Sequence, residues 1–146
     1  MSTLRKTPAH AAATSIILCG IPKGEPVNLL STIPILRIFS VDKAYEFYRD
    51  FLGFTVAWEH RYEPALPLYA SVKRGNIELH LSEHHGDASP GSTVFIPMQG
   101  IDELCRELNA KAYGYARPGI EEPGHGRTMQ IADPFGNRLR FCELAP

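Results

Sequence analysis

The sequence has few cysteines, almost no net charge and no long hydrophobic run. Its three cysteines, Cys19, Cys105 and Cys142, form no C-x-x-C pair and cannot all pair within one chain, which argues against a disulfide-stabilised secreted scaffold. The formal net charge is −1 and no run of Lys or Arg is present, so a nucleic-acid partner is not indicated. No apolar run reaches the ~18–20 residues of a membrane span. We therefore expect a cytoplasmic protein that binds neither nucleic acid nor membrane.

The composition is that of a globular domain, and the domain follows an N-terminal segment with a basic start and a mildly apolar middle. A hydrophobic fraction of 44% and a charged fraction of 21% over 146 residues fit one folded domain. Near the start, Arg5 and Lys6 precede a mildly apolar stretch at 11–21, which loosely imitates a signal peptide. Polar residues interrupt this stretch and no good cleavage site follows it. We expect residues 1–30 to be an N-terminal extension, with secretion as the alternative, and residues 31–146 to be the domain.

The first half of that domain shows the pattern of a strand, a helix and three more strands. Apolar residues at helical spacing, from Ala44 to Leu52, follow the capping residue Ser40 and precede Gly53, a residue that commonly ends a helix. A tight turn at Gly75-Asn76 indicates a hairpin. The expected strands are 33–39, 55–60, 68–74 and 77–81.

The second half repeats this order after a polar linker. A helical apolar stripe runs from Ile101 to Leu108, and the segment Asp133 to Asn137 predicts a hairpin turn. The expected strands are 93–97, 112–116, 127–132 and 138–142. The predicted fold class is therefore α+β: two βαβββ modules, about 31–82 and 92–146, forming a curved mixed sheet around a cleft. Such a cleft is a favoured place for a ligand.

Three segments carry a resemblance to a known family: ILRIFSVDKAYEFYRDFLGF, GNIELHLSE and ADPFGNRLRFCE. They resemble the glyoxalase/bleomycin-resistance/dioxygenase (vicinal oxygen chelate) superfamily. Its marks here are a helix ending in FY-x-x-x-LGF and a DP-x-GN turn. The resemblance implies a small-molecule cleft and, as in bleomycin-resistance proteins, a homodimer whose clefts are made from both chains.

The enzymes of this superfamily hold a divalent metal at four strand positions. By resemblance, these positions fall on Ile33, Glu78, Thr93 and Arg140. One carboxylate cannot hold the ion and an arginine would repel it, so we expect no metal and no other cofactor. The leading hypothesis is small-molecule (drug or metabolite) binding and sequestration without a metal centre, as in bleomycin-resistance proteins, which transform nothing. The alternative is a metal-dependent lyase, isomerase or dioxygenase using Glu78 and His80; a structural or regulatory role would need an exposed apolar patch.

Six residues are predicted to line the ligand cleft: Arg37, Trp58, Glu78, His80, His125 and Arg140. Glu78 and His80 lie two apart on one strand and therefore point to the same face. The resemblance further predicts a salt bridge from Arg140 to Glu78 across the former metal position. Bleomycin binders carry a tryptophan where His125 stands, so bleomycin is a placeholder ligand. The charge of the ligand stays open.

Overall fold

The computed structural model describes residue 24 and residues 26–146. Residues Thr32–Pro146 form one compact unit. Most of the expected N-terminal extension, including its signal-like stretch, lies outside the described residues. Within the described part of the chain, no helix is long and apolar enough to cross a membrane.

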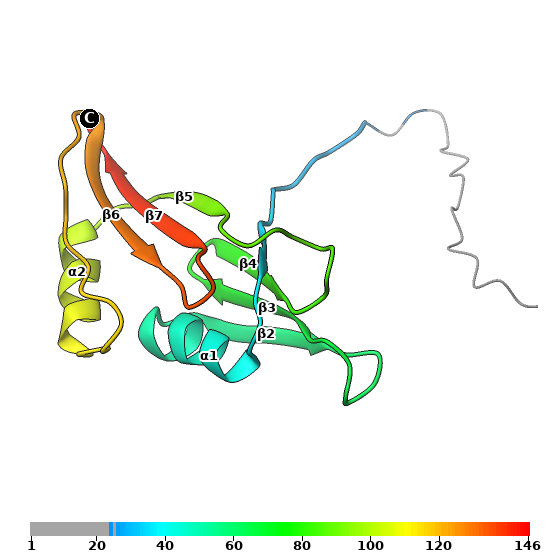
Figure 1. The fold of residues 1–146 in the computed structure, drawn as a ribbon. Coiled ribbons are helices and arrows are strands. Elements are labelled where there is room, and N and C mark those ends of the chain that lie inside the picture. The colour runs from blue at the N-terminus through cyan, green and yellow to red at the C-terminus, as the bar shows by residue number, and fades with distance from the viewer. Residues whose placement is uncertain (1–23, 25) are drawn as a thin grey trace, which may run out of the picture. The chain divides into compact units, whose positions relative to one another are not determined.

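The first module is built as predicted, with four strands and one helical segment (Figure 1). Its elements are β1 (Ile35–Arg37), α1 (Val41–Tyr45), η1 (Glu46–Phe51), β2 (Thr55–His60), β3 (Tyr69–Arg74) and β4 (Ile77–Ser82). The sheet order is β1-β4-β3-β2, with β1 parallel to β4 and the other pairs antiparallel. The predicted cap is present, because the Ser40 hydroxyl accepts a hydrogen bond from the Lys43 amide.

The helix differs from the prediction in its second half, where it widens into the π-helical turns of η1. The carbonyl groups at its end are bound by side chains from elsewhere in the chain. Lys111 Nζ donates to the carbonyl oxygens of Asp50 and Phe51 at 3.1 and 2.7 Å. Arg74 donates to the carbonyl of Leu52 at 2.6 Å. These contacts satisfy acceptors that a helix end otherwise leaves to water.

The second module has the same order with one strand reduced to a single bridge. Its elements are β5 (Thr93–Pro97), α2 (Ile101–Ala110), β6 (Gly126–Ala132) and β7 (Arg138–Leu144), and its sheet order is β5-β7-β6. The predicted strand at 112–116 is wrong. Ala112 has a φ of 50° and its amide bonds back to the Asn109 carbonyl, so the chain there is still closing the helix. The strand-like contact comes later, where Glu121 pairs with Thr128.

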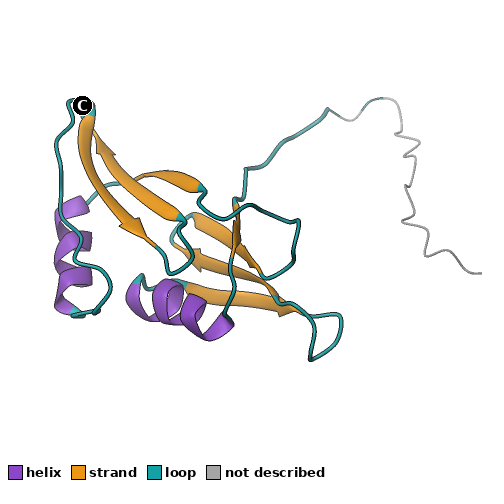
Figure 2. Cartoon of the chain, in the orientation of Figure 1, coloured by secondary structure: helices purple, strands orange, loops and turns teal. Residues whose placement is uncertain are grey.

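The two sheets are separate within the chain, each with one helical segment beside it (Figure 2). The α+β class and the two modules are confirmed, but one chain does not join them into a single curved sheet. Instead the modules share one hydrophobic core, with Phe47 and Leu79 from the first and Leu104 and Phe141 from the second.

A buried polar network also ties the modules together, and it joins the two sequence motifs. Tyr48, from the FY motif, donates to Asp133 Oδ2 at 2.7 Å. Asp133 Oδ1 accepts from the amides of Phe135 and Asn137 and so shapes the DP-x-GN turn. The Asn137 side chain donates to the carbonyl of Arg37, the last residue of β1 in the first module. The FY motif and the DP-x-GN motif therefore contact each other, and this contact joins the two modules.

Candidate functional site

The first sheet has one face against the core and one open face. Leu36, Val72, Leu79 and Leu81 are buried on the core face. On the other face the register places Ile35, His80, Ser71 and Trp58 in one row across all four strands. This row is the centre of what we call the open face.

A β-bulge directs Trp58 onto the open face. Val56 pairs with Val72, but Trp58 rather than Ala57 pairs with Ser71, so β2 carries one extra residue. Without that residue, alternation would turn the indole to the opposite side of the sheet. Trp58 stacks on Tyr69 with centroids 5.8 Å apart and planes 9° apart. The result is a flat aromatic platform, with Trp58 43% exposed.

His80 links this aromatic platform to Glu78. Its ring lies edge-on to Trp58 and Tyr69, at 5.1 and 5.2 Å between centroids. Its Nδ1 lies 2.7 Å from the Tyr69 hydroxyl and its Nε2 lies 3.1 Å from Glu78 Oε1. Because an ionised carboxylate only accepts, Nε2 donates to Glu78, and in the neutral tautomer with this proton Nδ1 accepts from the phenol. The hydrogen-bonded order is therefore Tyr69 to His80 to Glu78.

Glu78 is held ionised by its neighbours. The Ser71 hydroxyl donates to Glu78 Oε1 at 2.7 Å, and Lys73 Nζ lies 3.6 Å from Oε2. The Ser71 hydrogen bond, followed by those from His80 and the charge of Lys73, lowers the pKa of Glu78 from its ordinary value. Burial and the charge of Asp87 raise the pKa of Tyr69, so the phenol remains a donor at neutral pH.

Arg37 completes the group on the first sheet. It lies in the next row of the open face, paired with Ser82. Its guanidinium donates to the carbonyls of Ile38 and Ser82, at 3.3 and 3.4 Å, and lies 4.6 Å from the Phe39 ring centroid. The structure thus brings together Arg37, Trp58, Glu78 and His80, four of the six predicted cleft residues.

The other two predicted residues lie in the second module, Arg140 on β7 and His125 just before β6. His125 and Arg140 both line a pocket of about 660 Å³ beside the segment 117–123. Both Nε and Nη2 of Arg140 donate to Gln130 Oε1, at 3.1 and 2.8 Å. The predicted salt bridge from Arg140 to Glu78 is therefore wrong within one chain, because each side chain has other partners on its own sheet.

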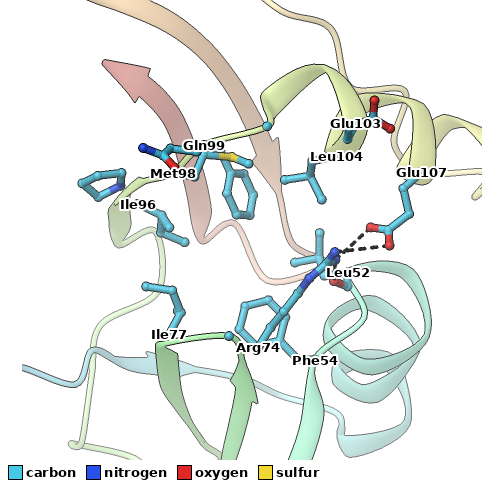
Figure 3. A pocket seen from close by; sticks show the side chains of 14 residues that line it. Leu52, Phe54, Arg74, Ile77, Ile96, Met98, Gln99, Glu103, Leu104 and Glu107 are labelled. Atoms are coloured by element: carbon cyan, nitrogen blue, oxygen red, sulfur yellow. Dashed lines mark hydrogen bonds and ion pairs between the residues drawn. The ribbon is translucent and has the colours of Figure 1, made fainter. Parts of the chain in front are cut away.

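A second and larger hollow, of about 700 Å³, lies at the seam between the modules (Figure 3). It opens between the β3–β4 turn, the end of β5 and α2, and apolar side chains such as Ile77, Ile96 and Leu104 surround it. An ion pair from Arg74 to Glu107, at 2.9 Å, crosses one side. None of the predicted cleft residues lines it. Sequence reasoning missed it because its apolar positions follow the same pattern as ordinary core positions.

Arg127, in the His125-Gly126-Arg127 segment, has a structural role. It forms two hydrogen bonds with Asp102, at 2.6 and 2.7 Å, and lies near Glu122 and Glu143. The Asp102 hydrogen bonds raise the pKa of Arg127 further above its already high value. The arginine therefore fastens β6 to the start of α2.

The donor set does not fit a divalent metal. Of the four positions that the superfamily enzymes use, only Glu78 offers a ligand atom of the required kind, and Arg140 brings a positive charge. Within residues 24 and 26–146, no three His, Cys, Asp or Glu side chains converge as ligands.

Two modules that each run strand, helix and then further strands, with the helix on one side of a small mixed sheet, define the glyoxalase/bleomycin-resistance class of fold. The family model for "Glyoxalase superfamily protein" matches residues 23–145. The chain belongs to the glyoxalase superfamily.

Several solved structures share this fold. The bleomycin-binding protein from bleomycin-producing Streptomyces verticillus, complexed with copper(II)-bleomycin, is 28% identical, with a TM-score of 0.63 over 82% of this chain and 100% of that one. The bleomycin resistance determinant encoded on transposon Tn5 is 20% identical, with a TM-score of 0.63 over 81% and 100%. TnmS3, an antibiotic binding protein from Streptomyces sp. CB03234, is 19% identical, with a TM-score of 0.59 over 82% and 100%. No curated protein matches the chain.

Proposed function

We propose that this protein binds and sequesters a small molecule, a drug or metabolite, without transforming it. The observation that carries the proposal is the open face of the first sheet, where a stacked Trp58–Tyr69 pair adjoins an ionised carboxylate. An aromatic platform binds flat rings, and the nearby Glu78 and His80 offer hydrogen-bond partners. The 28% identity to a bleomycin-binding protein across that protein's whole length supports this class of ligand.

The proposal includes a homodimer. Within the described residues, β1 pairs only with β4 and β5 only with β7, so each is a sheet edge. Each carries an exposed large apolar side chain, Ile35 at 38% and Phe95 at 47%. Unpaired edges with apolar side chains favour pairing with another chain. Pairing β1 of one copy with β5 of the other would place the open face of the first sheet beside the face of the partner's second sheet that points away from its core. The two faces would form one cleft, and all six predicted residues would line it.

The proposed compartment is the cytoplasm. The described cysteines, Cys105 and Cys142, are both unpaired thiols. Buried or half-buried free cysteines are common in reducing compartments. Fractionation of the source cells tests this part.

Fluorescence titration with bleomycin tests the function, because Trp58 is the only tryptophan. A saturable change in emission at micromolar drug is expected. His80→Ala should weaken binding about tenfold, since it removes the ring that contacts both aromatic side chains and Glu78. Tyr115→Ala is the matched control, because Tyr115 is 80% exposed and lies in the other module. Its affinity should equal that of the unmodified protein.

Two results would contradict the proposal. One is an absence of any saturable change with bleomycin or with related aromatic glycopeptides. The other is a stoichiometric divalent metal in the purified protein, which would favour a metal-dependent lyase, isomerase or dioxygenase.

A further inference from the structure

The second sheet carries arginines that the fold does not neutralise. Most arginines of the described chain pair with carboxylates, namely Arg49, Arg61, Arg74, Arg106 and Arg127. Within the same residues, four arginines pair with none: Arg37 in the first module, which donates to backbone carbonyls, and Arg117, Arg138 and Arg140 in the second. Arg138 and Arg140 lie two apart on β7 and therefore share one face, the one opposite the core.

Arg140 is oriented by a neutral partner. Two of its N–H groups donate to the single amide oxygen of Gln130, the residue directly opposite on β6. A guanidinium has five N–H donors, so three remain for another group. Gln130 fixes the plane of the guanidinium and leaves its charge in place. A glutamate there would have neutralised it.

A pocket lies in front of these donors. It has a volume of about 660 Å³, and its charged lining consists of Arg117, Arg140 and one carboxylate, Glu121, with His125 as a further polar group. Glu121 is tied to β6 through its backbone bridge to Thr128. The pocket therefore has an excess of positive charge and a preoriented fork of donors.

We propose that this pocket is an anion subsite, and that the ligand carries a carboxylate or a phosphate-type group bound by Arg140. A guanidinium fork matches the two oxygens of such a group in paired hydrogen bonds. The inference rests on the proposed ligand-binding function and adds the charge of one end of the ligand. It gives the second sheet a recognition role distinct from the aromatic platform of the first.

The test is an NMR titration of the full chain that follows the Arg140 Nε–H signal. The probes are benzoate and phenylphosphonate, with benzylammonium as the cationic counterpart, at constant ionic strength. We expect a saturable shift with at least one anion and none with benzylammonium. The two anions distinguish a carboxylate ligand from a phosphate-type ligand.

Gln130→Glu is the decisive variant, because it is nearly isosteric and supplies the missing carboxylate to Arg140. It should weaken anion binding about tenfold or more while thermal stability is retained. Arg49→Gln is the control, because it changes the net charge by the same amount at a surface pair with Asp50. It should leave anion binding unchanged. An unmoved Arg140 signal, an equal response to benzylammonium, or full binding by Gln130→Glu would overturn the proposal. The bleomycin titration reads Trp58 on the other sheet, so failure of this subsite and failure of drug binding are separate results.

Discussion

At the scale of single residues, the ionisation of Glu78 on the open face depends on the hydrogen bonds that its carboxylate accepts. Glu78 accepts from Ser71 and His80, and the Ser71 contact is the stronger cause of its lowered pKa. The carboxylate stays charged down to a lower pH than an ordinary glutamate, and as pH falls through that lowered value the stabilising contacts are lost. At neutral pH the carboxylate is charged with or without this hydroxyl, and the Ser71 hydrogen bond extends its ionised range toward lower pH.

Ser71→Ala is expected to raise the pKa of Glu78 toward its ordinary value, because the largest stabilising contact is gone. The measurement is a pH titration of the Glu78 side-chain carboxyl carbon by NMR. Ser92→Ala serves as the control, since the Ser92 hydroxyl donates only to the carbonyl of Ser89. A Glu78 titration curve that does not move in Ser71→Ala would refute this assignment.

Residue-scale predictions from sequence succeeded where periodicity decides them. Alternation along a strand put Glu78 and His80 on one face, and the structure confirms it. The bulge that brings Trp58 to the same face has no sequence signal, because Ala57 is an ordinary strand residue. The partners of Arg140 were equally hidden, since they depend on which strand lies opposite.

At the scale of elements, the end of the first helical segment is fixed by a glycine and by two side chains that are distant in the sequence. Gly53 has a φ of 74°, and a Cβ there would lie 3.1 Å from Arg74 Nη1, which holds the Leu52 carbonyl. The sequence predicted the stop at Gly53. It could not predict the π-helical turns before it, because Lys111 and Arg74 come from distant parts of the chain.

Gly53→Ala is expected to lower the free energy of unfolding by about 1–2 kcal/mol, since an L side chain is strained at this φ. Urea unfolding measures the change. Gly119→Ala is the matched control: its φ is unstrained and nothing lies within 4 Å of an added Cβ. Equal effects of the two substitutions would rule out the backbone explanation.

Tyr48→Phe probes the network that joins the modules. It removes the hydrogen bond to Asp133 and should cost about 1–2 kcal/mol at neutral pH. Burial, with the charge and hydrogen bond of Asp133, raises the pKa of Tyr48 well above its ordinary value of 10.0.

Above that ordinary value the unfolded phenol ionises while the folded one stays protonated, so the native protein loses stability as pH rises. Phenylalanine cannot ionise, so Tyr48→Phe should lose less stability than the unmodified protein between pH about 9.5 and 11. Urea unfolding at these pH values gives the comparison. Parallel curves for the two proteins would contradict the assignment.

At the scale of the whole molecule, the described chain presents two sheets, each with one face away from the core, and four edge strands, of which β1 and β5 are the proposed contact. The sequence predicted the repeated module, because both halves carry the same alternation of strand and helix patterns. It misplaced the 112–116 strand, because Tyr113 and Tyr115 give this segment the composition of a strand, whereas Tyr113 stacks on Phe51 and Tyr115 packs against Tyr113. It also could not show that the sheets stay separate within one chain, since sheet pairing is a long-range property.

The homodimer is tested by sedimentation velocity. The unmodified protein should sediment at twice the mass of one chain. Phe95→Asp should yield monomers, because it places a charge on the exposed side of an edge strand. Leu66→Asp, at a 40% exposed loop position, should leave the dimer intact. A monomeric unmodified protein would contradict the proposed interface.

The central claim is that a small molecule binds without the help of a protein-bound metal. The direct measurement is calorimetric titration of preformed copper(II)-bleomycin into protein that has been treated with a chelator and then freed of it. Saturable binding of one ligand per cleft is expected, with the same affinity before and after chelator treatment. Binding that disappears after the treatment and returns with added divalent metal would contradict it.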